Sequence, residues 1–150
     1  MKKKLRKFNF SENFIINNYF KKLNFNKEGT FNFENDASYI KMKKYNKLII
    51  TTDSISEDID FFRKDSPKSI AKKIITVNLS DLSAMGASPH SYSLNLFLPS
   101  YVKKEWLSKF SNELLNLQNK YNYYLIGGDL SKSNKLQISS SFFGLSKNKI

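Results

Sequence analysis

The stretch from residue 66 to residue 89, SPKSIAKKIITVNLSDLSAMGASP, constrains the fold of this chain more than any other. Ser66 followed by Pro67 is typical of a helix start, because a serine hydroxyl caps free N–H groups and proline suits the first helical position. Gly86 and then Pro89 are the matching stop. A long helix with a wide apolar face must be covered by another layer, so the sequence predicts a layered domain.

A carboxylate falls on the apolar side of that helix. With about 100° between successive residues, one arc holds Ile70, Ile74, Val77, Asp81 and Met85, with Asn78 at its margin. This spacing predicts that Asp81 lies on the packed side, where an unpaired carboxylate costs several kcal/mol. Two interpretations remain open: Asp81 binds a metal ion, or it bonds the backbone of a neighbouring loop.

Apolar periodicity outlines the other elements. Helical spacing predicts helices over 11–23, with Ser11 as N-cap, and over 103–121. Alternating or β-branched runs predict strands, the first two forming a hairpin, over 37–42, 47–52, 91–99, 123–129 and 135–145. The order helix, strand, strand, helix, strand, helix, strand, strand predicts an α+β fold, an α/β sandwich with helices packed on one sheet. A length of 150 residues predicts a single domain.

Three more acids stand where predicted strands begin or end, a common place for ligand sites. They are Asp53, after Thr51 and Thr52; Asp129, after Gly127 and Gly128; and Asp36, before the strand predicted over 37–42. Carboxylate and hydroxyl oxygens suit Mg²⁺, whereas a chain with no cysteine and one histidine offers little to Zn²⁺. The two glycines would also let a phosphate approach the backbone. The alternatives are an Asx turn at Asp53 and an ordinary hairpin turn at residues 127–129.

The net charge of +12 does not by itself indicate a nucleic-acid partner. Only Arg6 and Arg63 among the 25 basic residues are arginines, so the guanidinium groups that recognise phosphates and bases are nearly absent. We interpret the lysines as a solvated surface, and no nucleic-acid partner is expected. No stretch reaches the ~20 apolar residues of a membrane span or looks like a secretory leader, so a soluble, cytoplasmic protein is expected.

Four stretches resemble the thiamine-monophosphate kinase family: KLIITTDSISEDIDF, SPKSIAKKIITVNLSDLSAMGASP, LFLPSYVKKEWLSKFSNEL and YLIGGDLSKSNKLQIS. They follow one another with the family's spacing, and the resemblance runs from about residue 10 to the end of the chain. That family belongs to the aminoimidazole ribonucleotide synthetase (PurM-like) superfamily. The resemblance implies a PurM N-terminal-like domain, with a mixed, largely antiparallel sheet and two main helices on one face.

The same resemblance implies an activity and a set of site residues. The family transfers the γ-phosphoryl group of ATP to thiamine monophosphate, giving thiamine diphosphate, with several Mg²⁺ ions bound. The positions that match the family's metal ligands are Asp36, Thr51, Thr52, Asp53, Asp81 and Asp129. Gly128 and Asp129 match a segment that also contacts ATP. A homodimer through the sheet is implied as well.

The chain departs from the family pattern in ways that bear on function. Asn35 stands where one of two paired acids is usual, and Asp60 stands where a substrate-contacting histidine is common. The chain matches only the N-terminal half of the family, whose C-terminal domain supplies further acids and much of the substrate pocket. An alternative interpretation is therefore a non-catalytic nucleotide-binding, metal-binding or dimerisation module of the same fold.

Overall fold

The computed structural model describes residues 10–35, 37–41 and 47–146, and these form a single sheet covered by helices. The strands are β1 (Lys47–Ser56), β2 (Ser88–Leu98), β3 (Tyr124–Lys132) and β4 (Gln137–Ser146). The long helices are α2 (Pro67–Ala84) and α3 (Lys104–Tyr121). Shorter helical turns precede them: α1 (Glu12–Ile15), η1 (Ile16–Phe20), η2 (Lys21–Asn24) and η3 (Glu28–Phe33).

The strand order is β1-β4-β2-β3. β4 lies in the middle and pairs antiparallel with both β1 and β2, whereas β3 pairs parallel with β2 at the edge. The pairing of β1 with β4 is in register from Lys47↔Ser146 to Ser56↔Gln137. The predicted α+β fold with a mixed, largely antiparallel sheet is confirmed.

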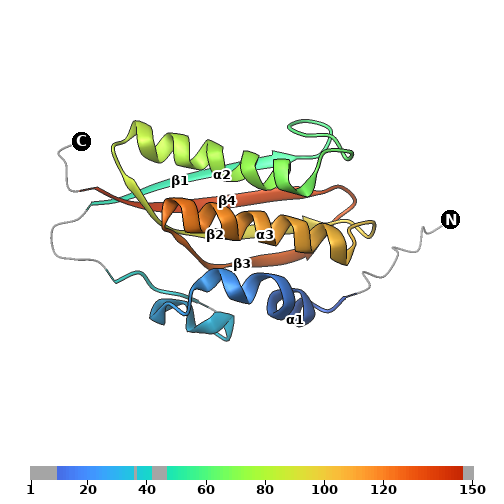
Figure 1. Ribbon diagram of the computed structural model, residues 1–150, viewed down its shortest axis with the longest axis horizontal. Helices are drawn as coiled ribbons and strands as arrows, with labels where there is room; N and C mark the ends of the chain where they lie inside the picture. The colour runs from blue at the N-terminus through green and yellow to red at the C-terminus, as the bar shows by residue number, and fades with distance from the viewer. Residues whose placement is uncertain (1–9, 36, 42–46, 147–150) are drawn as a thin grey trace.

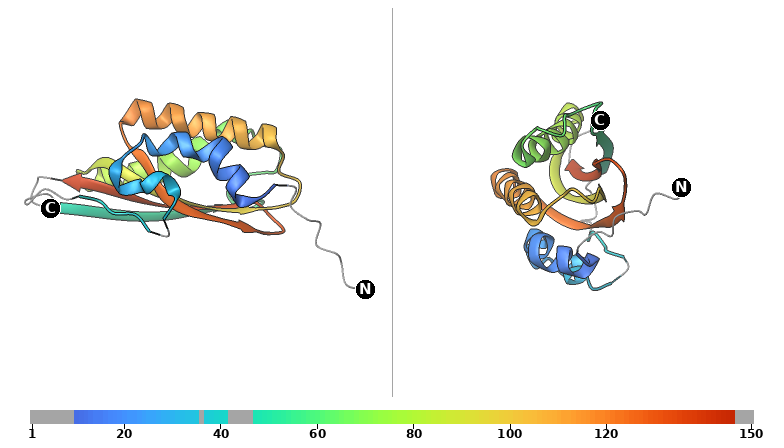
Figure 2. Two further views of the ribbon diagram at one scale, coloured as in Figure 1. Left: turned by 90° about the horizontal axis from the view of Figure 1, so that it is seen from below. Right: turned by 90° about the vertical axis from the view of Figure 1, so that its right-hand side faces the viewer.

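Both long helices cover the same face of the sheet, as Figure 2 shows when the molecule is viewed along the strands. The N-terminal turns lie beside β3 and α3 and protect that edge (Figure 1). The opposite face of the sheet carries the exposed side chains of Leu48 and Ile50. Among the described residues, no helix is both long and apolar enough to cross a membrane.

A buried amide ties the N-terminal turns to the helical layer. Gln118 of α3 is fully buried; its Oε1 accepts a hydrogen bond from the Tyr92 hydroxyl (3.0 Å), and its Nε2 donates to the Leu23 carbonyl (2.8 Å). The Tyr92 ring in turn stacks on Phe142 with centroids 4.9 Å apart. Because both ends of Gln118 are paired, its burial carries little desolvation penalty.

The first part of the chain differs from the sequence-based prediction. The predicted helix over 11–23 begins at its Ser11 cap but breaks into α, π and 3-10 turns. No strand occurs among the described residues 37–41, so the predicted hairpin is wrong there. β1 instead finds its partner in β4 from the far end of the chain, because tertiary pairing overrides local proximity.

Two strands also run further than predicted. β1 continues to Ser56, so Asp53 lies inside a strand and the expected loop at that residue is wrong. β3 continues through Gly127, Gly128 and Asp129 to Lys132, so these residues form no turn. Pairing along β2 holds them extended, with a register shift between Tyr92 and Ser93 that accommodates one extra residue of β3.

We predict that the two glycines of β3 differ sharply in tolerance to alanine. A Cβ at Gly128 would lie 1.9 Å from the Leu94 carbonyl oxygen of β2, whereas one at Gly127 would meet only the Ser38 hydroxyl, at 3.6 Å. Gly128→Ala should therefore force the parallel strands apart and lower the free energy of unfolding by about 3 kcal/mol. Gly127→Ala should stay within about 0.5 kcal/mol of the wild type in urea denaturation. Equal losses in the two variants would contradict this account of Gly128.

Candidate functional site

The buried face of α2 is centred on an asparagine rather than on Asp81. Asn78 is fully buried and lies among Ala71, Ile74, Ile75 and Leu82, which face the sheet and α3. Asp81 is exposed at the border of this face, and Met85 is 45% exposed. The prediction that Asp81 lies on the packed side is therefore wrong, because the buried stripe is centred on Asn78 and leaves Asp81 at its border.

At that border, Asp81 contacts the sheet. The Thr51 hydroxyl of β1 donates a hydrogen bond of 2.8 Å to Asp81 Oδ2. Since side chains alternate along a strand, Asp53 projects to the same face as Thr51. β1 and α2 thus bring Thr51, Asp53 and Asp81 together, three residues that the sequence had singled out separately.

The surroundings of Asp53 disfavour its ionised form. Its Oδ2 is buried and has no hydrogen-bond partner among the described residues. Burial raises the pKa of the Asp53 carboxyl above its ordinary value, and the negative charge of Asp81 raises the pKa further. An unpaired carboxylate oxygen beside a second carboxylate is an arrangement that a divalent cation would relieve.

The donor set fits Mg²⁺ in chemistry. Two carboxylates and a hydroxyl supply hard oxygen atoms, and Mg²⁺ commonly takes one or two protein carboxylates and completes its shell with water and phosphate oxygens. Within the described part of the chain, no three histidine, aspartate or glutamate side chains gather closely enough to hold a metal ion by themselves. A cation here would need oxygen atoms of other kinds as well.

Two other predicted metal residues, Thr52 and Asp129, lie on the opposite face of the sheet. Thr52 points away from α2, and its hydroxyl lies 2.8 Å from that of Ser141. Asp129 is aligned with Asn95, which is aligned with Ser139, and directly opposed residues share a face, so Asp129 shares that of Thr52. Its Oδ2 accepts a hydrogen bond of 2.7 Å from Ser131. Three strand spacings, about 14 Å along the sheet, separate the β1 and β3 positions.

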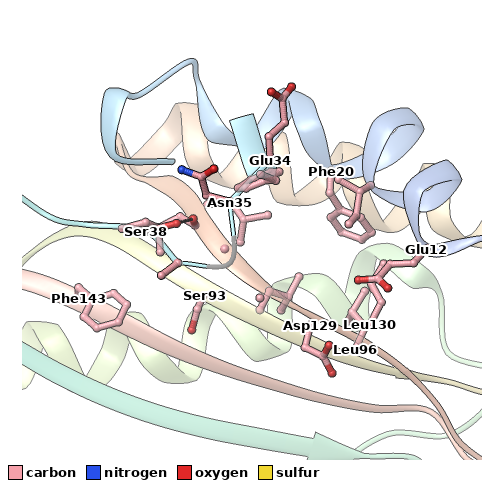
Figure 3. Close-up of a pocket in the computed structure, with 18 of the residues that line it drawn as sticks. Glu12, Phe20, Glu34, Asn35, Ser38, Ser93, Leu96, Asp129, Leu130 and Phe143 are labelled. Atoms are coloured by element: carbon pink, nitrogen blue, oxygen red, sulfur yellow. Dashed lines mark hydrogen bonds between the residues drawn. The ribbon is translucent and has the colours of Figure 1, made fainter. Parts of the chain in front are cut away.

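Asp129 lines a cavity of about 800 Å³ that lies between the N-terminal turns and strands β2 and β3. Figure 3 shows Glu12, Glu34 and Asn35 on one side of this cavity and Asp129 on the other, with Phe20 and Phe143 among the apolar wall. Gly127 and Gly128 also line the cavity. A volume of this size, lined by both apolar and polar side chains, is typical of a small-molecule site.

Asp60 and Asp36 complete the predicted set. The Asp60 carboxylate accepts a hydrogen bond of 2.8 Å from the backbone N–H of Ser56 and so closes the turn after β1. Its contact with a substrate stays a prediction. Asp36 lies outside the described residues.

Sequence patterns did not predict that side chains from residues 12–35 and 37–40 form a wall of the cavity. The turns there are short and irregular, so no periodicity indicates which side chains point inward. One link is the Ser38 hydroxyl, which donates 2.6 Å to the Ile126 carbonyl of β3. Glu34, Asn35 and Ser38 lie beside a glycine-containing strand that is distant in sequence, and their polar character gives no such signal.

The mixed sheet in the order β1-β4-β2-β3, with two long helices on one face, is the architecture of a PurM-like α+β domain. The chain belongs to the family described as AIR synthase related protein, N-terminal domain, whose model matches residues 34–146.

Similar proteins are kinases of thiamine monophosphate. The chain is 39% identical over 145 residues to the thiamine-monophosphate kinase of Buchnera aphidicola subsp. Acyrthosiphon pisum, covering 94% of this chain and 43% of that protein. The crystal structure of thiamine monophosphate kinase from Aquifex aeolicus is 31% identical with a TM-score of 0.66, over 69% of this chain and 35% of that one. The structure of AaThiL complexed with AMPPCP and TMP is 30% identical with a TM-score of 0.68, over 71% and 35%. The chain thus spans less than half of the length of these relatives.

We predict that Asp53→Asn stabilises the cation-free protein at neutral pH. The raised pKa means that the folded state favours the protonated form of Asp53. The stability that protonated Asp53 contributes is therefore fully present at low pH, and it is lost as the pH rises through the pKa of Asp53 in the folded state. The asparagine removes the repulsion, and the free energy of unfolding at pH 7 should rise by about 1 kcal/mol. Thermal unfolding in EDTA between pH 4 and pH 7 measures this, with the gap from wild type widening as pH rises.

Asp129→Asn is the matched control, because this carboxylate already accepts a hydrogen bond from Ser131. It should not show the pH-dependent gain. If Asp53→Asn were less stable than wild type at pH 7 in EDTA, the proposed repulsion between Asp53 and Asp81 would be refuted.

Proposed function

We propose that this chain is the N-terminal, nucleotide-binding part of a thiamine-monophosphate kinase, which transfers the γ-phosphoryl group of ATP to thiamine monophosphate. The observation that carries the proposal is the unpaired Asp53 oxygen beside Asp81, in a fold shared with kinases of this substrate. Transfer between two anionic phosphates depends on charge neutralisation and alignment more than on a strong base. Paired carboxylates that hold a cation are suited to that task.

The residues of the α2–β1 contact have separate roles in this proposal. Asp53 and Asp81 hold Mg²⁺, and Thr51 fixes the Asp81 carboxylate through its 2.8 Å hydrogen bond. Further ions are proposed to bind at Thr52, Asp129 and Asp36, because these positions match metal ligands of the family. Bound Mg²⁺ neutralises phosphate oxygens and holds the reacting groups in line.

ATP is proposed to place its base in the cavity beside β3 and to extend its triphosphate towards the cation held by Asp53 and Asp81. Gly128 and Asp129 line the cavity, and the Phe20 and Phe33 side chains offer apolar surface to a base. The acidic groups on its walls would repel a polyphosphate unless cations intervene, which agrees with a Mg²⁺-dependent nucleotide. A similar protein, AaThiL, has been solved in complex with AMPPCP, which supports a nucleotide as the ligand of this fold.

Thiamine monophosphate is proposed to approach through the turn that contains Asp60.

A homodimer through the open face of the sheet belongs to the same proposal: Leu48 is 39% and Ile50 58% exposed there, and a second copy would cover them. Sedimentation velocity of the purified chain measures its mass directly, and a monomer at all concentrations would refute the dimer. A cytoplasmic location is part of the same proposal, because the proposed reaction uses ATP as its co-substrate.

The second candidate function is a non-catalytic nucleotide-binding or dimerisation module. It is favoured by Asp60, because a carboxylate repels a substrate phosphate where the family commonly has histidine. A kinase assay with ATP and thiamine monophosphate separates the two candidates. Turnover by the 150-residue chain would exclude the module.

We predict that Asp81→Asn abolishes Mg²⁺-dependent nucleotide binding without unfolding the protein. Asp81 is exposed, so the amide should be accommodated, but half of the carboxylate pair is lost. Affinity for a non-hydrolysable ATP analogue, measured by calorimetry with Mg²⁺, should fall by a factor of about 100, or roughly 2.7 kcal/mol.

Asp58→Asn serves as the control, since Asp58 is another exposed acid and pairs only with Lys135 among the described residues, at 2.9 Å. Its nucleotide affinity should match the wild type. Unchanged affinity in Asp81→Asn, with Mg²⁺ present, would refute the metal-site assignment.

A further inference from the structure

The most deeply buried polar side chain of α2 has one atom without a partner. Asn78 is 0% exposed, and its Nδ2 donates a hydrogen bond of 2.9 Å to the Ile74 carbonyl of the preceding turn. Its Oδ1 has no hydrogen-bond partner among the described residues. A buried amide oxygen left unpaired is costly, and the packing of α2 would be better served by leucine at this position unless that oxygen has a use.

The geometry of α2 and β1 places Asn78 level with Asp53. The chain reverses after β1, so α2 runs back along the strand (Figure 1). The Thr51 hydroxyl meets Asp81. Asn78 lies three residues before Asp81, which is about 4.5 Å back along the helix axis. Asp53 lies two residues after Thr51, which is about 6.7 Å along the strand in the same direction. Asn78 and Asp53 are therefore at nearly the same level.

The two unpartnered oxygens of this region therefore lie on facing elements. Asp53 Oδ2 projects from β1 towards the helical layer, and Asn78 Oδ1 belongs to the helix face that covers it. Neither oxygen can satisfy the other, because an ionised carboxylate and an amide carbonyl both only accept hydrogen bonds. A cation between them would satisfy both atoms at once, and amide oxygens are ordinary ligands of hard divalent ions.

We propose that Asn78 Oδ1 is a further ligand of the divalent cation held by Asp53 and Asp81. The inference rests on the proposed cation site and extends it to a residue that neither the acidic pattern nor the helical spacing had assigned. The hydrogen bond from Nδ2 to Ile74 holds the amide plane, so that Oδ1 is oriented before the ion arrives. Asn78 thus supplies a neutral oxygen in addition to the two carboxylates.

The test is Asn78→Leu, which keeps the volume and removes the oxygen. Mn²⁺ serves as the probe, with binding to the full chain followed by electron paramagnetic resonance and by the cation-induced rise in Tm. We expect the dissociation constant for Mn²⁺ to rise at least 10-fold, while the Tm in EDTA stays equal to or above that of the wild type, because an unpaired oxygen has been removed. Mn²⁺ affinity equal to the wild type would overturn the proposal.

Gln118→Leu is the matched control, since it removes a buried amide whose two ends are both paired, outside the proposed site. It should lower the Tm in EDTA and leave Mn²⁺ affinity unchanged. A merely structural role for Asn78 predicts the same pattern in Asn78→Leu, and that result would overturn the proposal.

Asn78→Asp gives a second reading should the leucine variant fail to fold. A third carboxylate should lower the Tm in EDTA through repulsion and bind Mn²⁺ at least as tightly as the wild type. Weaker Mn²⁺ binding in this variant would contradict a ligand role. Wild-type protein that binds no Mn²⁺ would refute the cation site itself, whereas binding that depends on Asp53 but not on Asn78 would refute this inference alone.

Discussion

The packing of α2 against β1 is the contact on which the rest of the molecule depends. It closes the helical layer over the edge of the sheet, with Ile70, Ile74 and Ile75 fully buried beneath it. The same contact brings Asp81 close enough to Asp53 for its negative charge, together with burial, to raise the pKa of the Asp53 carboxyl. A fold stabilised by apolar burial therefore contains, at its border, a carboxylate oxygen that has no hydrogen-bond partner among the described residues. The proposed cation site thus depends on the packing of α2 on β1 rather than on a loop.

Much of the fold could be predicted because local signals were strong. Ser66 caps α2 by accepting the Ser69 N–H at 3.1 Å, as its place before Pro67 indicates, and both long helices occur where periodicity puts them. Which strands pair with one another could not be predicted from local sequence patterns. β1 pairs with β4 some ninety residues later in the chain, and nothing in either stretch specifies that partner. The irregular turns before residue 34 carry no regular period, so their structure could not be predicted either.

The candidate site was predicted residue by residue but not as an arrangement. Asp53, Asp81 and Thr51 were identified from their types and positions, and the structure brings them together. The face on which each acid lies depends on the strand register, which separates Asp129 from Asp53. Asn78 was placed at the margin of the apolar arc because helical spacing alone cannot tell which edge of that arc is turned towards the sheet. Its unpaired oxygen is visible only in three dimensions.

The central claim is that the α2–β1 contact holds a divalent cation. The most direct measurement is the anomalous difference density of a crystal of the full chain soaked in Mn²⁺. The account predicts a peak between β1 and α2, at about 2.1 Å from carboxylate oxygens of Asp53 and Asp81. A well-diffracting crystal with Mn²⁺ bound beside Asp129 alone, or bound nowhere on the chain, would contradict it.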